Sequence, residues 1–301
     1  MKIRLVDVDG WDKKRGKRFP NLALMKISAW YKAQGHNVAW ATGYDADLVF
    51  ASKIFTFTPD PLELAAFRCP VERGGTGYSI DRKLTPEIEA MPPDYSLYPS
   101  CRYAIGFLTR GCVRACPWCV VPQKKGSLQI TGEIETVAAG RKTVVLLDNN
   151  FLAAPDDFVA EQLDKAARLG LRLDFNQGLD ARLVTPENAA RLARCRWREY
   201  IRFACDSAAM IDPVARAVLL IREAGYTGRF FSYLLVQDDI GDAEKRLRAL
   251  LRLDVRPFAQ PYRAFEPDYE VDPEQADFAR FVNVKGGQLC SKIHFKDYRR
   301  F

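Results

Sequence analysis

The chain has 301 residues, of which 48% are hydrophobic and 28% are charged, and its formal net charge is +7. This composition allows a substantial core, and no run approaches the roughly 18 apolar residues that a membrane-spanning helix needs. Mild basicity permits contact with nucleic acid or phosphorylated substrates without requiring it, and we interpret the scattered Arg residues as solvated helix faces.

The N-terminal third is predicted to alternate between strands and a helix. Alternation and apolar spacing predict strands at 2–8, 38–41 and 48–52 and a helix at 21–34. This order is typical of a parallel α/β unit. Four prolines between residues 86 and 100 predict a linker, so we assign residues 1–95 to a first domain.

Two short stretches of this domain invite a phosphate-binding interpretation, and both are weak signals. The run KKRGKR at residues 13–18 is strongly basic, but a short basic run is more often an ordinary solvated loop. Gly74, Gly75 and Gly77 are expected to form a flexible turn, because no helix signal follows them.

Three cysteines follow an apolar run at 103–108 with the spacing C-x3-C-x2-C. They are Cys112, Cys116 and Cys119. A loop this short can wrap three corners of a [4Fe–4S] cluster, for which Cys thiolates are the standard ligands, and it leaves one iron open. The main alternative is a structural zinc site, which needs four nitrogen or sulfur ligands, and His36 and His294 are both distant in sequence. Three further cysteines have no partner at metal spacing and are expected to be buried thiols: Cys195, Cys205 and Cys290.

From residue 103 the pattern of strand, loop and helix repeats. Strands are predicted at 103–108, 143–148, 171–176, 199–205, 229–235 and 254–259. Helices are predicted near 131–139, 155–169, 186–194, 210–224 and 241–252. Six such units predict an α/β domain at residues 100–265 that forms an open, partial (β/α)6 barrel of TIM type, followed by a closing segment at 266–301. In such barrels the chemistry lies at the carboxyl ends of the strands.

The cysteine loop resembles that of the radical S-adenosylmethionine (radical SAM) superfamily, whose signature is C-x3-C-x2-C with an aromatic residue, here Trp118, before the last Cys. The continuation at 120–126 resembles the C-x-x-P-x-x-R-G run of the methylthiotransferase and cobalamin-type branches, with Lys125 in place of Arg. The stretch QGLDAR at 177–182 resembles another part of the cobalamin-type members, and the superfamily's fold is also a partial barrel.

The metal-type spacing of the cysteines fits a reducing cytoplasm better than a secreted disulfide framework. The resemblance implies an enzyme in which S-adenosylmethionine (SAM) binds the open iron of a [4Fe–4S] cluster. Reduction then yields a 5′-deoxyadenosyl radical that abstracts hydrogen from a substrate, and a flavodoxin or ferredoxin supplies the electron. It also implies SAM-binding roles for Asp148, Asn149 and Asn150 toward its amino group, and contacts of Gln177 and Arg182 to SAM or to a substrate carboxylate. Asp206 and Ser207, at the end of the fourth strand, are further candidates to hold ribose hydroxyls. For the first group, helix capping is an equally good interpretation.

Several substrates and chemistries stay open. The N-terminal domain resembles a shortened flavodoxin-like, cobalamin-binding domain, but Asp9 stands where the cobalt-ligating His is needed, which argues against cobalamin and a cobalamin-dependent methyltransferase. Methylthiotransferases that modify tRNA have three further cluster cysteines, and this region has only Cys69 and Cys101. The substrate can be a small molecule of nucleoside type or a nucleic acid, and a non-catalytic iron–sulfur electron carrier is a third interpretation of the same cysteine loop.

Overall fold

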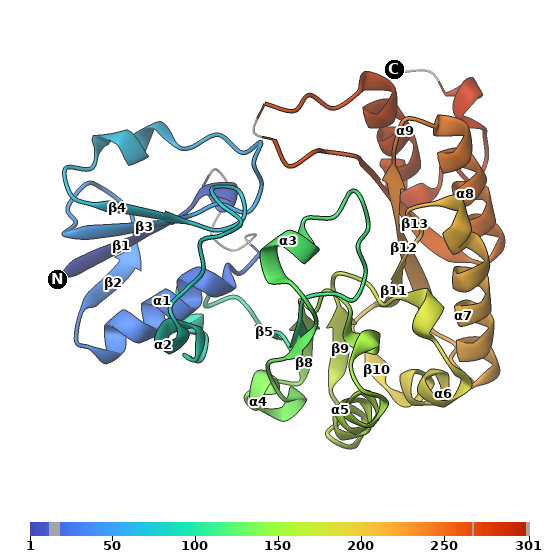
Figure 1. The fold of residues 1–301 in the computed structure, drawn as a ribbon, viewed down its shortest axis with the longest axis horizontal. Helices are drawn as coiled ribbons and strands as arrows, with labels where there is room; N and C mark the ends of the chain where they lie inside the picture. Colours follow the sequence, from blue (N-terminus) through green and yellow to red (C-terminus); the bar gives the residue numbers. More distant parts are fainter. Residues whose placement is uncertain (12–18, 267, 299–301) are drawn as a thin grey trace. The chain divides into compact units, whose positions relative to one another are not determined.

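The computed structural model describes residues 1–11, 19–266 and 268–298, so the basic run at 13–18 lies outside the described residues (Figure 1). The chain divides into two compact units. The first unit comprises Met1–Arg102 and Phe265–Tyr269, and the second comprises Tyr103–Ala264 and Glu270–Phe301. Both are α/β units built on parallel strands, as the sequence predicts.

The sheet of the first unit has the strand order β2-β1-β3-β4, and all of its pairings are parallel. Its strands are β1 (Lys2–Asp7), β2 (Asn37–Trp40), β3 (Leu48–Ser52) and β4 (Val71–Gly74). The helix α1 (Leu22–Ala33) begins where the Asn21 side chain accepts a hydrogen bond from the Leu24 N–H. Every strand and helix predicted for this unit is confirmed within one or two residues.

The fourth strand was not predicted, and the turn after it differs from the expected flexible turn. β4 has the sequence VERG, without alternation, and it forms only because it pairs with β3. The glycines that follow pack closely instead of forming a flexible turn. Gly75 has φ +95°, and a Cβ there would lie 2.4 Å from the Lys53 carbonyl oxygen, so only glycine fits.

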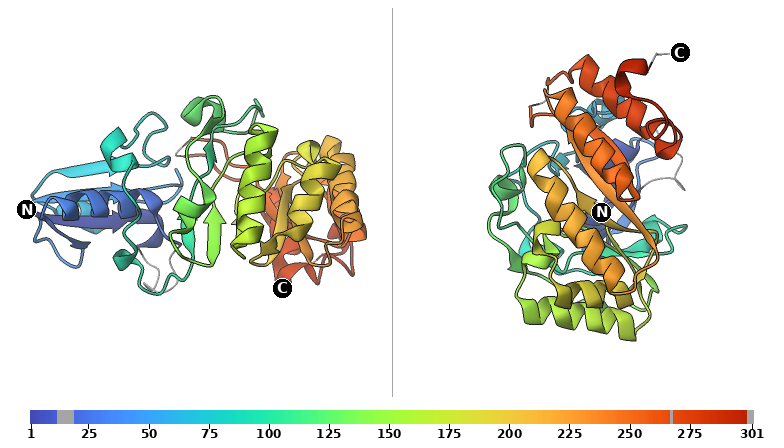
Figure 2. Two further views of the ribbon diagram at one scale, coloured as in Figure 1. Left: turned by 90° about the horizontal axis from the view of Figure 1, so that it is seen from below. Right: turned by 90° about the vertical axis from the view of Figure 1, so that its right-hand side faces the viewer.

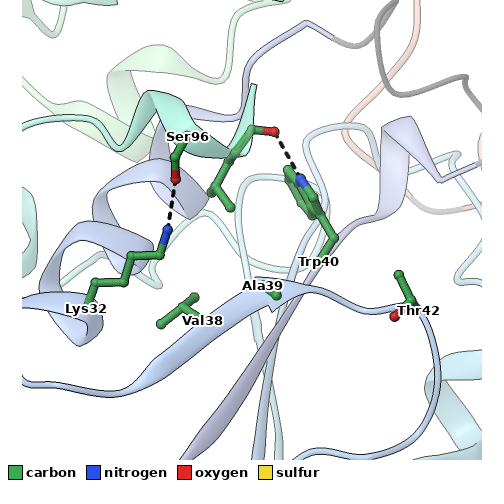
Figure 3. A pocket seen from close by; sticks show the side chains of 7 residues that line it. Lys32, Val38, Ala39, Trp40, Thr42 and Ser96 are labelled. Atoms are coloured by element: carbon green, nitrogen blue, oxygen red, sulfur yellow. Dashed lines mark hydrogen bonds between the residues drawn. The ribbon is translucent and has the colours of Figure 1, made fainter. Parts of the chain in front are cut away.

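The segment at 86–100 is packed onto the first unit, so its prediction as a linker is wrong. It contains α2 (Pro86–Glu89), and Leu97 and Tyr98 are buried. Figure 3 shows two of the contacts: Lys32 Nζ donates to Ser96 Oγ at 2.8 Å, and the Trp40 indole N–H donates to the Leu97 carbonyl at 3.0 Å. Pro86 begins α2, and the other three prolines follow short helical turns, so they do not mark a mobile connection.

The second unit contains the six predicted β/α repeats, arranged in two parallel sheets with strand orders β10-β9-β8-β5 and β11-β12-β13. The strands are β5 (Ala104–Gly106), β8 (Thr143–Leu146), β9 (Arg172–Phe175), β10 (Arg196–Trp197), β11 (Tyr200–Ala204), β12 (Arg229–Val236) and β13 (Val255–Pro261). The short edge strand β10 was not predicted. A single parallel bridge between Leu179 and Phe203 links the two sheets.

Helices cover the outer side of these strands and bury the larger core. They are α4 (Ile134–Ala138), α5 (Asp156–Arg168), α6 (Pro186–Arg194), α7 (Ile211–Glu223), α8 (Ile240–Arg252) and α9 (Pro273–Asn283). The helix α6 begins at a capping box in which Thr185 and Asn188 exchange hydrogen bonds. Figure 2 shows α7 and α8, in gold and orange, side by side against the strands. Among the described residues no helix is both long enough and apolar enough to cross a membrane.

Candidate functional site

The three cysteines lie on one loop whose two ends are fastened together. Strands β6 (Thr109–Arg110) and β7 (Gln129–Ile130) pair antiparallel at its base, and α3 (Val121–Lys125) forms its returning arm. At the neck, Gly111 has φ +87°, and a Cβ there would lie 2.2 Å from the Ser127 carbonyl oxygen. Backbone pairing therefore closes the loop at its base, and only glycine fits at its neck.

Asp148 holds the start of this loop. Its carboxylate accepts from the Leu108 N–H, from the Thr109 N–H at 2.6 Å and from the Thr109 hydroxyl at 2.8 Å, and the residue is 2% exposed. Burial raises the pKa of Asp148 to about 6, although these donors oppose the shift. The next residue, Asn149, accepts from the Gly111 N–H at 3.1 Å. Both side chains bind the cysteine loop itself.

Two of the three thiols already accept hydrogen bonds. Cys112 Sγ lies 3.4 Å from the Arg114 N–H nitrogen and 3.5 Å from Asn150 Nδ2, and Cys119 Sγ lies 3.5 Å from the Val121 N–H nitrogen. Donors directed at sulfur favour the thiolate, which is the form that binds metal.

Burial and neighbouring negative groups oppose formation of the thiolate at two of the cysteines. Burial raises the pKa of Cys116 and of Cys119, and the neighbouring thiols and Asp206 raise both further. Arg182 lies close enough to Cys116 to oppose this shift. Thiolates at Cys116 and Cys119 therefore need a compensating positive charge, which a bound metal would supply.

Beside the thiols, the buried carboxylate of Asp180 organises a partly exposed ionic network. It accepts from Arg114 Nε at 3.0 Å, from Arg182 Nε at 2.7 Å and from Asn150 Nδ2 at 3.3 Å. Although burial alone would raise it, the pKa of Asp180 is held below its usual range by Arg182 and Arg114. Sequence reasoning assigned no role to Asp180 or Arg114, although both belong to the motifs that it singled out.

One acceptor in this network has no partner. Asn150 is buried, its amide nitrogen is shared by Cys112 and Asp180, and its Oδ1 has no hydrogen-bond partner among the described residues. A buried amide oxygen without a donor costs free energy, so the site is incomplete until a ligand supplies one.

The remaining predicted residues lie nearby with fewer contacts. Asp206 accepts from the Leu235 N–H at 3.3 Å, and burial raises its pKa. Ser207 immediately follows it and precedes a short 3-10 turn. Gln177 is exposed in the turn after β9, and Trp118 is half-buried on the cysteine loop.

The chemistry of the donor set is compatible with an iron–sulfur cluster, for which Cys thiolates are the standard ligands. A structural zinc ion needs four ligands, and the loop offers three thiols. Among the described residues no three His, Cys, Asp or Glu side chains are arranged to hold one metal ion. Cys195, Cys205 and Cys290 are buried, as predicted.

The inner faces of the strands form a second feature that sequence reasoning missed. Register pairs Arg202 with Phe231, and Tyr233 with Phe258, on neighbouring parallel strands, so these side chains share one face. Arg202 is anchored by Asp174 at 2.7 Å. The Phe258 ring is 39% exposed and packs on Phe231 and Tyr233 with centroid separations of 6.0 and 6.3 Å.

Comparison with known proteins does not assign this chain. No protein-family model matches it, and no curated protein gives a significant sequence match.

Proposed function

We propose that this protein is a radical SAM enzyme in which Cys112, Cys116 and Cys119 hold a [4Fe–4S] cluster and leave one iron for S-adenosylmethionine. The observation that carries the proposal is the closed cysteine loop at the carboxyl ends of parallel strands, with hydrogen-bond donors at two sulfurs. When bound, the cluster supplies the electron that cleaves SAM and generates a radical at its 5′ carbon.

The neighbouring side chains divide between holding the loop and binding the cofactor. Asp148 and Asn149 keep the loop start in place through its backbone N–H groups. The unpaired Oδ1 of Asn150 accepts from the SAM amino group, which satisfies its missing hydrogen bond. Arg182 is 38% exposed and paired on one side with Asp180, so its other side is available to a carboxylate. Gln177 lies in the same turn, and Asp206 and Ser207 provide acceptors for ribose hydroxyls.

The fold is consistent with this assignment. We propose that the second unit is the partial (β/α)6 barrel of the superfamily and that the first unit is flavodoxin-like, since the order β2-β1-β3-β4 matches the start of the doubly wound order 2-1-3-4-5. Cobalamin is not part of the proposal. Asp9, which occupies the position of the cobalt ligand, binds the Ile54 N–H at 2.6 Å and the Thr58 hydroxyl at 2.7 Å.

The substrate that we propose is a small molecule with a planar ring, such as a nucleoside. The support is the aromatic inner face around Phe231, Tyr233 and Phe258, because such rings stack on aromatic side chains. The use of a flavodoxin or ferredoxin as reductant, in a reducing cytoplasm, follows from the same proposal.

The test is an anaerobic assay of the full-length protein reconstituted with iron and sulfide. We expect about four iron atoms per chain and the formation of 5′-deoxyadenosine from SAM with dithionite. Substituting Ala for Cys112, Cys116 and Cys119 together should abolish both. The matched control, Cys69→Ala/Cys101→Ala, removes two other partly buried thiols and should retain both. Formation of 5′-deoxyadenosine by the triple variant refutes the proposal, and a cluster without SAM cleavage indicates an electron carrier.

A further inference from the structure

Positive charge is concentrated at the amino ends of the strands of the second unit, opposite to the cysteine loop. Figure 1 shows the loop with α3 at one end of β8 and β9, and α4 and α5 leading into these strands at the other end. Five segments enter the strands at this edge: 139–143, 168–172, 194–199, 222–229 and 252–256. Together they contain eleven Lys and Arg against three Asp and Glu, a net charge of +8, whereas the rest of the chain has 34 against 35.

Helix dipoles explain only part of this charge. Each segment follows a helix, and the carboxyl end of a helix carries about half a negative charge. Five helix ends therefore offset roughly 2.5 of the eight charges, and an excess of about five remains. Two acids from outside the segments, Asp164 and Asp174, also form ion pairs with arginines of this edge. Each acid also pairs with an arginine outside the segments, so including the two acids together with these two arginines leaves the net charge unchanged.

The unpaired positive charge is most concentrated where two arginines lie side by side. Arg172 and Arg196 are register partners on the parallel strands β9 and β10, and both are exposed. With Lys142 they line a hollow of about 480 Å³, in which Lys142 Nζ donates to the Leu169 carbonyl. Within the described residues neither arginine has a carboxylate partner. Like charges on paired strand positions repel, so this arrangement favours a bound anion.

The chemistry of the edge favours nucleic acid among polyanions. Ten of the eleven cations are Arg, whose planar fork matches phosphate oxygens with two hydrogen bonds. A membrane surface would need apolar anchors as well, and none of the exposed large hydrophobic side chains falls in the five segments. The charge also extends along both sheets, which suits a chain of phosphates. We propose that this edge binds the phosphate backbone of a nucleic acid, independently of the cluster site.

The proposal is tested by fluorescence anisotropy with labelled 20-nucleotide single-stranded RNA and DNA of one sequence, over a series of KCl concentrations. We expect the logarithm of the binding constant for one or both strands to fall linearly with the logarithm of salt concentration. Arg172→Gln/Arg196→Gln should weaken binding about tenfold at low salt and reduce the slope by about 1.4, since each phosphate contact contributes roughly 0.7 on single strands.

The matched control is Arg68→Gln/Arg82→Gln, which removes the same charge from two exposed arginines of the first unit and should leave binding and slope unchanged. Circular dichroism of both variants checks folding. The variant lacking the three cluster cysteines should bind with unchanged affinity, so this result is separable from the proposed enzyme activity. Salt-independent or absent binding by the native protein overturns the proposal, as does equal binding by the two arginine variants, or binding only to phosphatidylserine vesicles.

Discussion

Among the described residues of the second unit Arg246 is the most completely buried cation, and its removal tests how the carboxyl edge is held together. It lies on α8 and is 1% exposed. Its Nη1 donates to the Cys205 carbonyl at 2.8 Å and to the Leu235 carbonyl at 2.9 Å, and its Nε pairs with Asp242 at 2.6 Å. One side chain therefore joins α8 to the ends of β11 and β12.

Arg246→Met keeps most of the volume and removes every donor. Each of the two carbonyls left buried and unpaired costs about 1–3 kcal/mol, whereas Asp242 is 27% exposed and regains water. We expect the free energy of unfolding to fall by about 3–4 kcal/mol, as measured by urea denaturation followed by circular dichroism. For Arg246→Lys we expect a free energy of unfolding between those of the native protein and Arg246→Met, because an ammonium group keeps the charge but not the planar fork of donors.

The control is Arg252→Met, at the exposed end of the same helix, for which only about 0.3–1 kcal/mol of helix-dipole stabilisation should be lost. If Arg246→Met destabilises the protein no more than this control does, the carbonyls do not depend on the arginine and the reasoning fails.

Three further predictions concern the first unit, the cysteine loop and α6. Although burial opposes the shift, contacts with Lys32 and two serines lower the pKa of Asp94 to about 2. The contribution of Asp94 to stability is therefore complete above its unfolded pKa and is lost as pH falls through its folded pKa. Asp94→Asn should therefore cost about 2 kcal/mol near neutral pH, and urea titrations should show this difference shrinking by about 1 kcal/mol between pH 6 and pH 3; a constant difference contradicts the pairing. Gly111→Ala should open the loop neck against Ser127 and lower the iron content after reconstitution, whereas undiminished iron would show that the neck tolerates a side chain. Thr185→Ala should remove a capping box and lower the free energy of unfolding by about 1 kcal/mol, and an unchanged urea midpoint would contradict this.

The sequence by itself predicted the local elements and the three thiols. Apolar spacing and capping residues define α1 and α6 because these signals act over a few neighbouring residues. The C-x3-C-x2-C spacing likewise predicts a metal loop without any knowledge of the fold. The strand β4 and the packed segment at 86–100 were missed, because each is stabilised by partners distant in the chain.

Tertiary structure alone decided what surrounds the thiols and where the charge lies. Asp148 follows β8 but holds the start of the cysteine loop, and Arg114 meets Asp180 across 66 residues of sequence. Arginines that look scattered along the chain collect at one edge because every parallel strand begins there. In a parallel α/β unit the crossovers bring all strand starts to one edge and all strand ends to the other, so distant segments become neighbours through a geometry that no local pattern encodes.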